Sequence, residues 1–269
     1  MRYATADNGE KIEAKPGAKG TCPGCGSQLI AKCGPVKINH WAHIGKRHCD
    51  PWWENETEWH REWKDHFPAA WQEICLEDRE TNEKHIADVR ADNGIVVEFQ
   101  HSFIKQEEMA SREQFYKNMV WVVDGTRLKT DLSRFHKNKD HLRNIWKGVL
   151  FLNPFPEETF NKNWLGKTKP VFFDFSGPQK RVPKGKQKLL FCLLPDSVGR
   201  GSVVLRMLEN EFVEHIESGM LSEYLQEACK SAQRYDELAS KQARSKKPDL
   251  LAMNRRKTLG YRRPGRRRL

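Results

Sequence analysis

The segment 85–102, HIADVRADNGIVVEFQHS, constrains the fold of this chain more than any other stretch. Two apolar runs, at 85–89 and 95–99, are rich in β-branched residues, which favour strands. The turn sequence Asp92-Asn93-Gly94 separates them. The segment therefore predicts a β-hairpin, and the neighbouring elements must be arranged around it.

The polar residues of this hairpin indicate a cation site. Asp88 lies late in the first predicted strand, and Glu98 and Gln100 lie two residues apart in the second. With the period of two in a strand, Glu98, Gln100 and Ser102 share one face. Carboxylates in apolar strands are costly unless something compensates them, and Mg²⁺ would do so. The alternative is a half-exposed hairpin whose polar face is simply hydrated.

Composition restricts the class of protein. The chain has 269 residues, 38% of them hydrophobic, which suffices for one large domain or two small ones. No apolar run approaches the roughly 20 residues that span a bilayer, and the N-terminus lacks the layout of a signal peptide. Seven cysteines, two of them in a C-x-x-C pair, suit metal binding in a reducing cytosol. We therefore expect a cytoplasmic protein without membrane association.

The positive charge is concentrated at the C-terminal end. Residues 241–269 hold twelve Lys and Arg against one acid, which equals the net charge of +11 of the whole chain. Such a tail binds phosphate backbones without reading sequence, so nucleic acid, DNA above all, is the expected partner. A solvated tail without a dedicated partner is the alternative. The candidate contact residues are Arg255, Arg256, Lys257, Arg262, Arg263, Arg266, Arg267 and Arg268.

The segment 22–49 predicts a structural zinc site. Cys22 and Cys25 form a knuckle, and His40 and His43 follow it, giving C-x₂-C…H-x₂-H. Zn²⁺ takes four such ligands tetrahedrally. Residues 28–31 and 36–39 are expected to pair as strands around a turn at Gly34-Pro35. The ligand set is open: Cys33, His48 and Cys49 are near, Cys49 could replace one histidine, and either histidine could instead be packed in a Trp-rich core.

Residues 56–66 predict a helix, with Asn55 as its N-cap and Pro68 just beyond its end. Spacing of four places Glu56, His60 and Lys64 on one face. An ordinary solvated face is the alternative for these three. Another face carries Trp59, Trp63 and Phe67, which are expected to face the core. Six of the nine Trp lie between positions 41 and 71, where core packing is favoured over stacking on bases.

The order of elements around the hairpin completes a core. A strand is expected at 72–76, a helix at 105–118 and a strand at 120–123, with a turn at Asp124-Gly125. The resulting order is αβββαβ, and the helix joining the third strand to the fourth makes part of the sheet parallel. The spacing of Asp88, Glu98 and Gln100 is similar to the D-x(n)-E-x-K signature of the PD-(D/E)XK nuclease superfamily, with Gln in place of Lys.

Taken together, these motifs resemble the competence protein CoiA-like nuclease family over about residues 15–126. The matching motifs, in chain order, are Cys22-Pro23-x-Cys25, His40-Trp41-Ala42-His43, Glu56-Thr57-Glu58-Trp59-His60 with Lys64, His85-Ile86-Ala87-Asp88-Val89, Val97-Glu98-Phe99-Gln100-His101-Ser102, Arg112 with Phe115-Tyr116, and Val120-Trp121-Val122-Val123-Asp124. The family is assigned to the PD-(D/E)XK superfamily and is linked to processing or recombination of DNA taken up in transformation.

The resemblance implies an α/β (α+β) fold with a restriction-endonuclease-like core and a mixed sheet. It implies that Asp88 and Glu98 bind Mg²⁺ or Mn²⁺ and that Gln100 holds the lysine position of the signature. It also brings Glu56 and His60 to the site from the first helix, while Lys64 or His60 could supply the positive charge that Gln100 lacks.

Four parts are expected along the chain. Residues 1–50 form a strand pair and a zinc-ribbon-like element, 51–126 the nuclease core, 127–240 an α/β extension or accessory domain, and 241–269 a basic tail without fixed structure. Within the third part we expect a loop at 151–156, strands at 171–175 and 188–194, and helices at 205–216 and 221–239.

The expected function is metal-dependent hydrolysis of phosphodiester bonds, with DNA as the expected substrate, in processing, recombination or defence. Two alternatives come from other classes. One is a non-catalytic, zinc-containing DNA-binding module, and the other is an adaptor that docks a partner protein.

Overall fold

The computed structural model describes residues 1–45, 49–52, 56–78, 81–178, 182–183, 185–199 and 201–245. The basic residues proposed to contact nucleic acid, from Arg255 to Arg268, lie outside these ranges, as do His48 and the proposed N-cap Asn55. No helix within the described ranges has both the length and the apolar character that crossing a bilayer requires.

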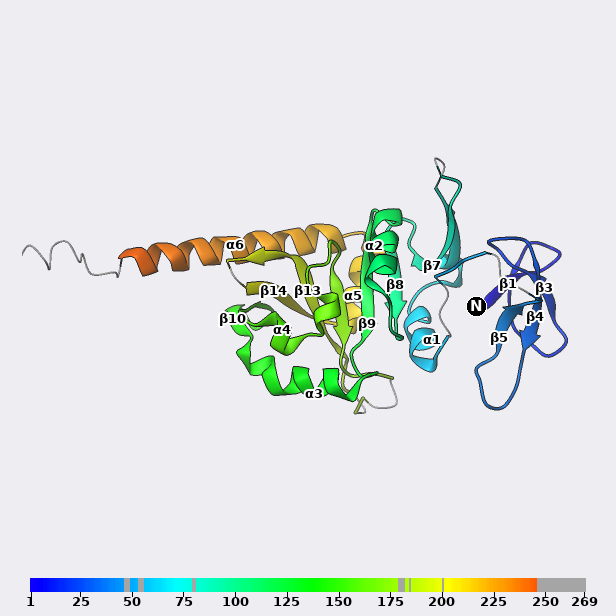
Figure 1. Ribbon diagram of the computed structural model, residues 1–269, viewed down its shortest axis with the longest axis horizontal. Helices are drawn as coiled ribbons and strands as arrows, with labels where there is room; N and C mark the ends of the chain where they lie inside the picture. The colour runs from blue at the N-terminus through cyan, green and yellow to red at the C-terminus, as the bar shows by residue number, and fades with distance from the viewer. Residues whose placement is uncertain are drawn as a thin grey trace, which may run out of the picture.

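The chain forms two sheets that lie side by side (Figure 1). The N-terminal sheet has the order β2-β1-β3-β4-β5, and all its pairs are antiparallel. Its strands are β1 (Tyr3–Thr5), β2 (Lys11–Glu13), β3 (Lys19–Thr21), β4 (Gln28–Lys32) and β5 (His40–His43). The predicted strand pair at the N-terminus is therefore present, whereas the strand expected at 36–39 is wrong. The strand that pairs with β4 begins only at His40, because residues 33–39, which include the turn at Gly34-Pro35, form the connection between the two strands.

The second sheet has the order β10-β11-β14-β13-β12-β9-β8-β7-β6 among the described residues. Its strands are β6 (Gln72–Glu77), β7 (Lys84–Arg90), β8 (Val96–Gln100), β9 (Met119–Asp124), β10 (Arg143–Trp146), β11 (Leu150–Asn153), β12 (Val171–Asp174), β13 (Leu189–Val198) and β14 (Gly201–Leu208). The β7–β8 hairpin is antiparallel, β8–β9 and β9–β12 are parallel, and the sheet is mixed as predicted.

Helices cover both faces of this sheet (Figure 1). They are α1 (Glu58–Lys64), α2 (Gln106–Phe115), α3 (Lys129–Asn138), α4 (Pro156–Thr159), α5 (Glu209–Ser218) and α6 (Leu221–Ser245), with 3-10 turns at Ala69–Trp71, Lys139–His141 and Lys162–Trp164. One core contains residues of α1, α5 and α6, and the other contains residues of α2 and α3. The order α1-β6-β7-β8-α2-β9 is the αβββαβ order expected from the sequence.

The C-terminal half continues the same sheet rather than folding apart from it, because β12 pairs directly with β9. Two expectations here are wrong. Residues 205–208 end β14 instead of starting a helix, and 150–153 form β11 instead of a loop. In both cases pairing with a neighbouring strand, which the local sequence does not report, decides the outcome.

Candidate active site

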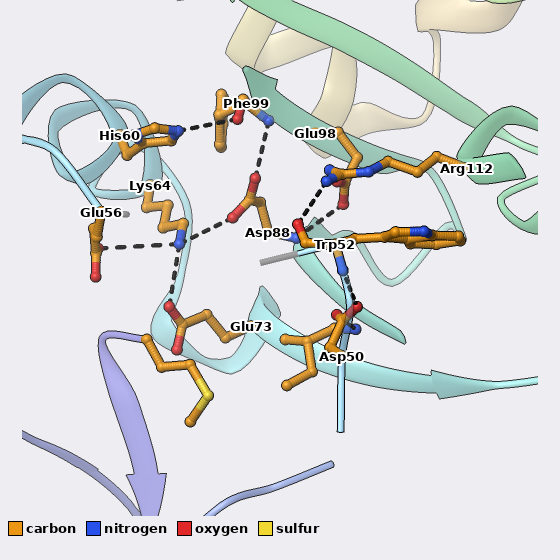
Figure 2. A pocket seen from close by; sticks show the side chains of 12 residues that line it. Asp50, Trp52, Glu56, His60, Lys64, Glu73, Asp88, Glu98, Phe99 and Arg112 are labelled. Atoms are coloured by element: carbon orange, nitrogen blue, oxygen red, sulfur yellow. Dashed lines mark hydrogen bonds and ion pairs between the residues drawn. The ribbon is translucent and has the colours of Figure 1, made fainter. Parts of the chain in front are cut away.

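The site lies where the two strands of the central hairpin separate. The pairing of β7 with β8 joins Val89 to Val97 and Arg90 to Val96. Beyond these two pairs, side-chain carboxylates instead of backbone carbonyls accept the backbone N–H groups. The N–H of Asp88 donates to Glu98 Oε1 at 3.2 Å, and the N–H of Phe99 donates to Asp88 Oδ2 at 3.0 Å. Asp88 and Glu98 are thereby held next to each other at the opening, as Figure 2 shows.

Both carboxylates line one pocket of about 60 Å³. In the described part of the chain this pocket is lined by five acidic side chains and two basic ones, namely Asp50, Glu56, Glu73, Asp88 and Glu98 with Lys64 and Arg112. Burial, and then the nearby charge of Asp88, raise the pKa of Glu98 to about 8 despite the presence of Arg112. Even without Glu98, four carboxyl groups line the pocket against these two basic side chains.

Helix α1 brings Lys64 into the pocket. Thr57 caps the helix: its hydroxyl accepts the N–H of His60, and its own N–H donates to the His60 ring. The Lys64 ammonium, 4% exposed, lies 3.0 Å from Asp88 Oδ1 and 3.1 Å from Glu73 Oε1. Burial lowers the pKa of Lys64, but the surrounding carboxylates raise it well above its ordinary value, so the lysine is charged.

Glu73 is a site residue that the sequence did not indicate. It lies between the pairs Gln72–Val89 and Ile74–Ala87 of β6 and β7, and its φ of 49° places its backbone in the left-handed region. Its carboxylate also accepts the backbone N–H groups of Arg2 and Tyr3 at 2.7 and 2.9 Å. Burial opposes ionisation, but Lys64 and these donors lower the pKa of Glu73 to about 2. The Glu73 carboxylate thus binds both the start of β1 and the Lys64 ammonium.

Arg112 holds Glu98 from the other side. Its guanidinium donates to Glu98 Oε2 at 2.8 Å, to Glu108 at 2.6 Å and to the Trp52 carbonyl at 2.5 Å. The sequence contains Arg112 within a family motif, but only the structure shows that it pairs with Glu98.

The pocket fits a hard divalent cation. Two neighbouring carboxylates, one of them with a raised pKa, are the donors that Mg²⁺ and Mn²⁺ prefer. Among the described residues a buried oxygen of Glu56, Oε2, has no hydrogen-bond partner, while its other oxygen lies 4.0 Å from Lys64. Lys64 lies between Glu56 and Asp88 (Figure 2), so Asp88 and Glu98 are the two carboxylates that could share an ion.

Two of the residues expected at the site have other contacts. His60 Nε2 lies 3.1 Å from the Phe99 carbonyl and Nδ1 lies 2.9 Å from Thr57 Oγ1, so the ring fixes α1 against β8. Gln100 is buried, and its amide donates to the Ser102 carbonyl at 3.2 Å. Gln100 lines a different pocket, beside Asp124, although it shares a strand face with Glu98 as predicted.

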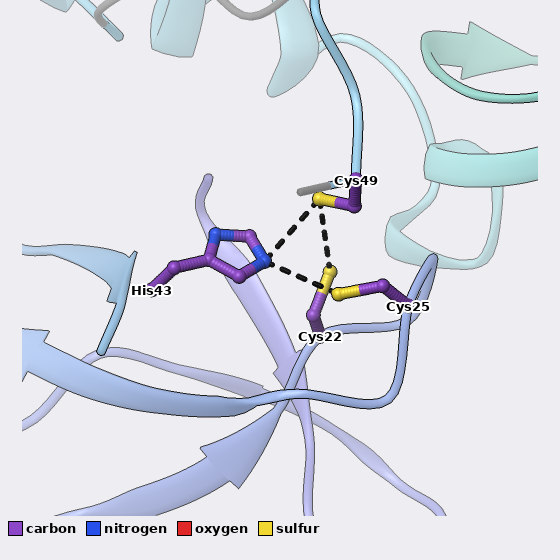
Figure 3. A group of neighbouring side chains, drawn as sticks. All are labelled: Cys22, Cys25, His43 and Cys49. Carbon is purple, nitrogen blue, oxygen red and sulfur yellow. Dashed lines mark hydrogen bonds between the residues drawn. The ribbon is translucent and has the colours of Figure 1, made fainter. Parts of the chain in front are cut away.

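The zinc candidates converge in the N-terminal part (Figure 3). The ligand atoms of Cys22, Cys25, His43 and Cys49 all lie within 4.8 Å of one another, and the two sulfurs of Cys22 and Cys49 are 3.8 Å apart. Tetrahedral zinc with Zn–S bonds of about 2.3 Å requires sulfur separations of about 3.8 Å. This cluster can bind zinc. Of the alternatives that the sequence left open, this grouping matches the one in which Cys49 takes the place of a histidine.

His40 is not part of this cluster. Its Nδ1 lies 2.8 Å from the Ile38 carbonyl, and as the first residue of β5 it stands three residues from His43, on the other face of the strand.

Burial raises the pKa of the Cys22 thiol to about 12, so a bound cation is needed to stabilise its thiolate.

Family models match two consecutive parts of the chain. The model of the competence protein CoiA N-terminal domain matches residues 6–51, which include the zinc cluster. The model of the competence protein CoiA nuclease-like domain matches residues 56–148, which include the acidic pocket. No curated protein and no solved structure matches the chain.

The fold and the two matches define a nuclease-like protein with an attached cysteine–histidine metal module. The chain belongs to the competence protein CoiA family. Its role is accordingly nuclease-related.

Proposed function

We propose that this protein is a nuclease that depends on Mg²⁺ or Mn²⁺ and hydrolyses phosphodiester bonds of nucleic acid, with DNA as the substrate, in DNA processing, recombination or defence. One observation carries the proposal. Asp88 and Glu98 stand together where β7 and β8 part, in a pocket whose acidic side chains outnumber its basic ones.

In this proposal Asp88 and Glu98 hold the divalent ion, and Glu56, which lines the same pocket beyond Lys64, binds one of the waters of the ion. When bound, the ion would lower the pKa of its water and neutralise charge on the phosphate. Glu98 must lose its proton to bind the ion, and its raised pKa makes this step dependent on pH.

Lys64 takes the part that the signature assigns to a lysine on the second hairpin strand. Its ammonium lies 3.0 Å from Asp88 Oδ1, so it can donate to a phosphate oxygen or orient the attacking water. Glu73 keeps it in place and charged. Gln100, which carries no charge and donates to the Ser102 carbonyl, contributes to packing instead.

One observation favours the non-catalytic alternative. Asp88 is already paired with Lys64, and Glu98 is already paired with Arg112. If these pairs persist in the presence of metal, the pocket is a structural charge cluster and the protein only binds nucleic acid.

The deciding experiment incubates the full chain with single-stranded DNA, double-stranded DNA and RNA, each with Mg²⁺, Mn²⁺ or EDTA. Cleavage that needs the divalent ion and is absent in Asp88→Asn supports the proposal. Binding without cleavage under every condition contradicts it and leaves the binder. A chain ending at residue 245 tests the tail separately: an adaptor would keep little affinity for DNA, whereas a nuclease would still cut at low salt.

A further inference from the structure

The segment 49–52 links the two metal sites within four residues. Cys49 is a ligand of the cysteine–histidine cluster, and both Asp50 and Trp52 line the acidic pocket. Each of these two side chains contacts one of the elements that carry the acidic residues.

Asp50 fixes the strand that carries Asp88. It is 7% exposed, and its Oδ2 accepts the N–H of Ile86 at 2.9 Å while its Oδ1 lies 3.0 Å from His85 Nδ1. Ile86 and Asp88 are two apart, so their N–H groups point to the same edge of β7, the edge that β8 has left. The Asp50 carboxylate therefore accepts the N–H of Ile86 where β8 no longer pairs with β7, two residues before Asp88.

Trp52 fixes the group that holds Glu98. Its carbonyl accepts from Arg112 at 2.5 Å, and Arg112 in turn donates to Glu98. Its indole ring stacks on the ring of His85 at an interplanar angle of 7° and meets the edge of Phe115. Asp50 Oδ1 also accepts the N–H of Trp52 at 2.9 Å, which joins the two supports into one unit.

We infer that Asp50 and Trp52 are positioning residues, through which the cysteine–histidine cluster fixes the separation of Asp88 and Glu98 and hence the affinity of the pocket for a divalent ion. This inference rests on the proposed function. Its physical basis is that Cys49, once held by zinc, restricts the backbone from which Asp50 reaches β7, so the acidic side chains are fixed before the ion arrives.

The test measures Mn²⁺ binding by calorimetry on the full zinc-loaded chain and on three variants. Asp50→Asn removes the charge, and Asp50→Glu keeps the charge but moves the carboxylate. Trp52→Leu removes the ring, which stacks on His85 and lies 5.5 Å from the Arg112 guanidinium, while the backbone carbonyl and every charge of the pocket stay in place. Asp92→Asn is the matched control, because Asp92 is an exposed acid at the other end of the same hairpin.

We expect the Kd for Mn²⁺ to rise by about tenfold or more in all three variants and by less than about twofold in the control. Zinc content stays at one ion per chain, and hydrogen exchange accelerates at residues 85–88 but not across β9. At saturating Mn²⁺ the cleavage rate returns toward the wild-type kcat, since the residues that bind the ion are intact.

Two results would overturn the inference. One is wild-type Mn²⁺ affinity in Asp50→Asn and Trp52→Leu. The other is full recovery of affinity in Asp50→Glu, which would show that charge and not position matters. A wild-type chain that binds no Mn²⁺ would instead contradict the proposed function itself, so the two failures are distinct. If Asp50→Asn does not fold, Trp52→Leu decides alone.

Discussion

Two buried lysines in this protein are each surrounded by three carboxylates. Lys64 faces Asp88, Glu73 and Glu56 at 3.0, 3.1 and 4.0 Å. Lys188 faces Glu209, Asp174 and Glu62 at 3.5, 3.7 and 3.9 Å. Helix α1 contributes to both clusters, through Lys64 to the first and Glu62 to the second. The residue types are the same, and the surroundings differ.

In the Lys188 cluster, protein groups satisfy the central carboxylate, that of Asp174. Asp174 is fully buried, and its Oδ2 accepts the indole N–H groups of Trp59 and Trp63 at 3.0 and 3.2 Å. Its Oδ1 accepts the N–H of Ser176 at 2.8 Å. The Lys188 ammonium lies 5.5 Å from the centre of the Trp63 ring. Every oxygen of Asp174 therefore has a protein donor, and the cluster serves to join α1 to β12.

The Lys64 cluster is open to a pocket. Glu56 Oε2 lacks a hydrogen-bond partner among the described residues, and in the same pocket the pKa of Glu98 is raised to about 8 by burial and by Asp88. The comparison teaches that a buried lysine among carboxylates is not by itself a catalytic signature. An unsatisfied acidic oxygen that lines a cavity is what separates a candidate site from a structural network.

The largest expected effect is on cleavage. Asp88→Asn or Glu98→Gln should lower the metal-dependent rate by about 10³-fold or more, because the ligands of the ion are lost. Asp174→Asn, the matched change in the Lys188 cluster, should leave the rate per folded molecule unchanged. A gel assay at fixed concentrations of folded protein measures all three. Cleavage in Asp88→Asn above a tenth of the wild-type rate would contradict the account.

The free energy of unfolding should show the reverse order, with the larger loss in the Lys188 cluster and the smaller loss in the Lys64 cluster. Lys188→Met leaves Asp174 buried without its cation and should cost about 3–5 kcal/mol in the free energy of unfolding. Lys64→Met should cost less, because water can enter its pocket, while it should abolish cleavage. Urea denaturation of both variants gives the values. Equal losses would mean that the two clusters have the same structural role.

The pH dependence is a further test, because an ion must displace the proton of Glu98. With a pKa of about 8 in the folded protein, Glu98 holds its proton at neutral pH. Affinity for Mn²⁺ should therefore rise about tenfold per pH unit below pH 8 and level off above it. Without metal, the folded chain retains a proton that the unfolded chain has released, so this group's contribution to stability falls between about pH 4.5 and pH 8.

Both trends should vanish in Glu98→Gln, in which residue 98 no longer titrates. Calorimetry between pH 6 and pH 9 checks the affinity, and thermal denaturation in EDTA checks the stability. A wild-type affinity that does not change over this range would show that Glu98 is not a ligand.

The smallest effect concerns the helix that the two clusters share. Thr57→Ala removes the N-cap of α1 and should cost about 1 kcal/mol of unfolding free energy. Thr130→Ala, at an exposed position of α3, is the control and should change little. A loss well above that of an ordinary cap would show that α1 depends on its first turn more than on its packing.

The sequence predicts the order of elements well but predicts parts of the site poorly. The hairpin, its turn and the face shared by Glu98 and Gln100 follow from periodicity and local turn chemistry, and the structure has them. The shortening of α1 to Glu58–Lys64 also has a local cause, since Thr57 provides the cap. The ends of strands depend instead on partners far away in the chain.

The residues that the sequence missed are placed by tertiary structure. Glu73 has a left-handed backbone conformation, φ 49°, and nothing in the run QEICLE indicates which residue adopts it. Asp50 has its role because β8 leaves the edge of β7, which no local pattern reports. His40 was a candidate ligand by spacing, and the strand register directs it elsewhere while Cys49 completes the cluster.

Anomalous scattering from crystals soaked in Mn²⁺ tests the central claim most directly. We expect a peak within bonding distance, about 2.0–2.3 Å, of carboxylate oxygens of both Asp88 and Glu98, with Lys64 or Arg112 displaced from one of them. The peak should be absent from Asp88→Asn crystals. A fully occupied peak elsewhere on the protein, or none at saturating Mn²⁺ with both ion pairs intact, would contradict the account.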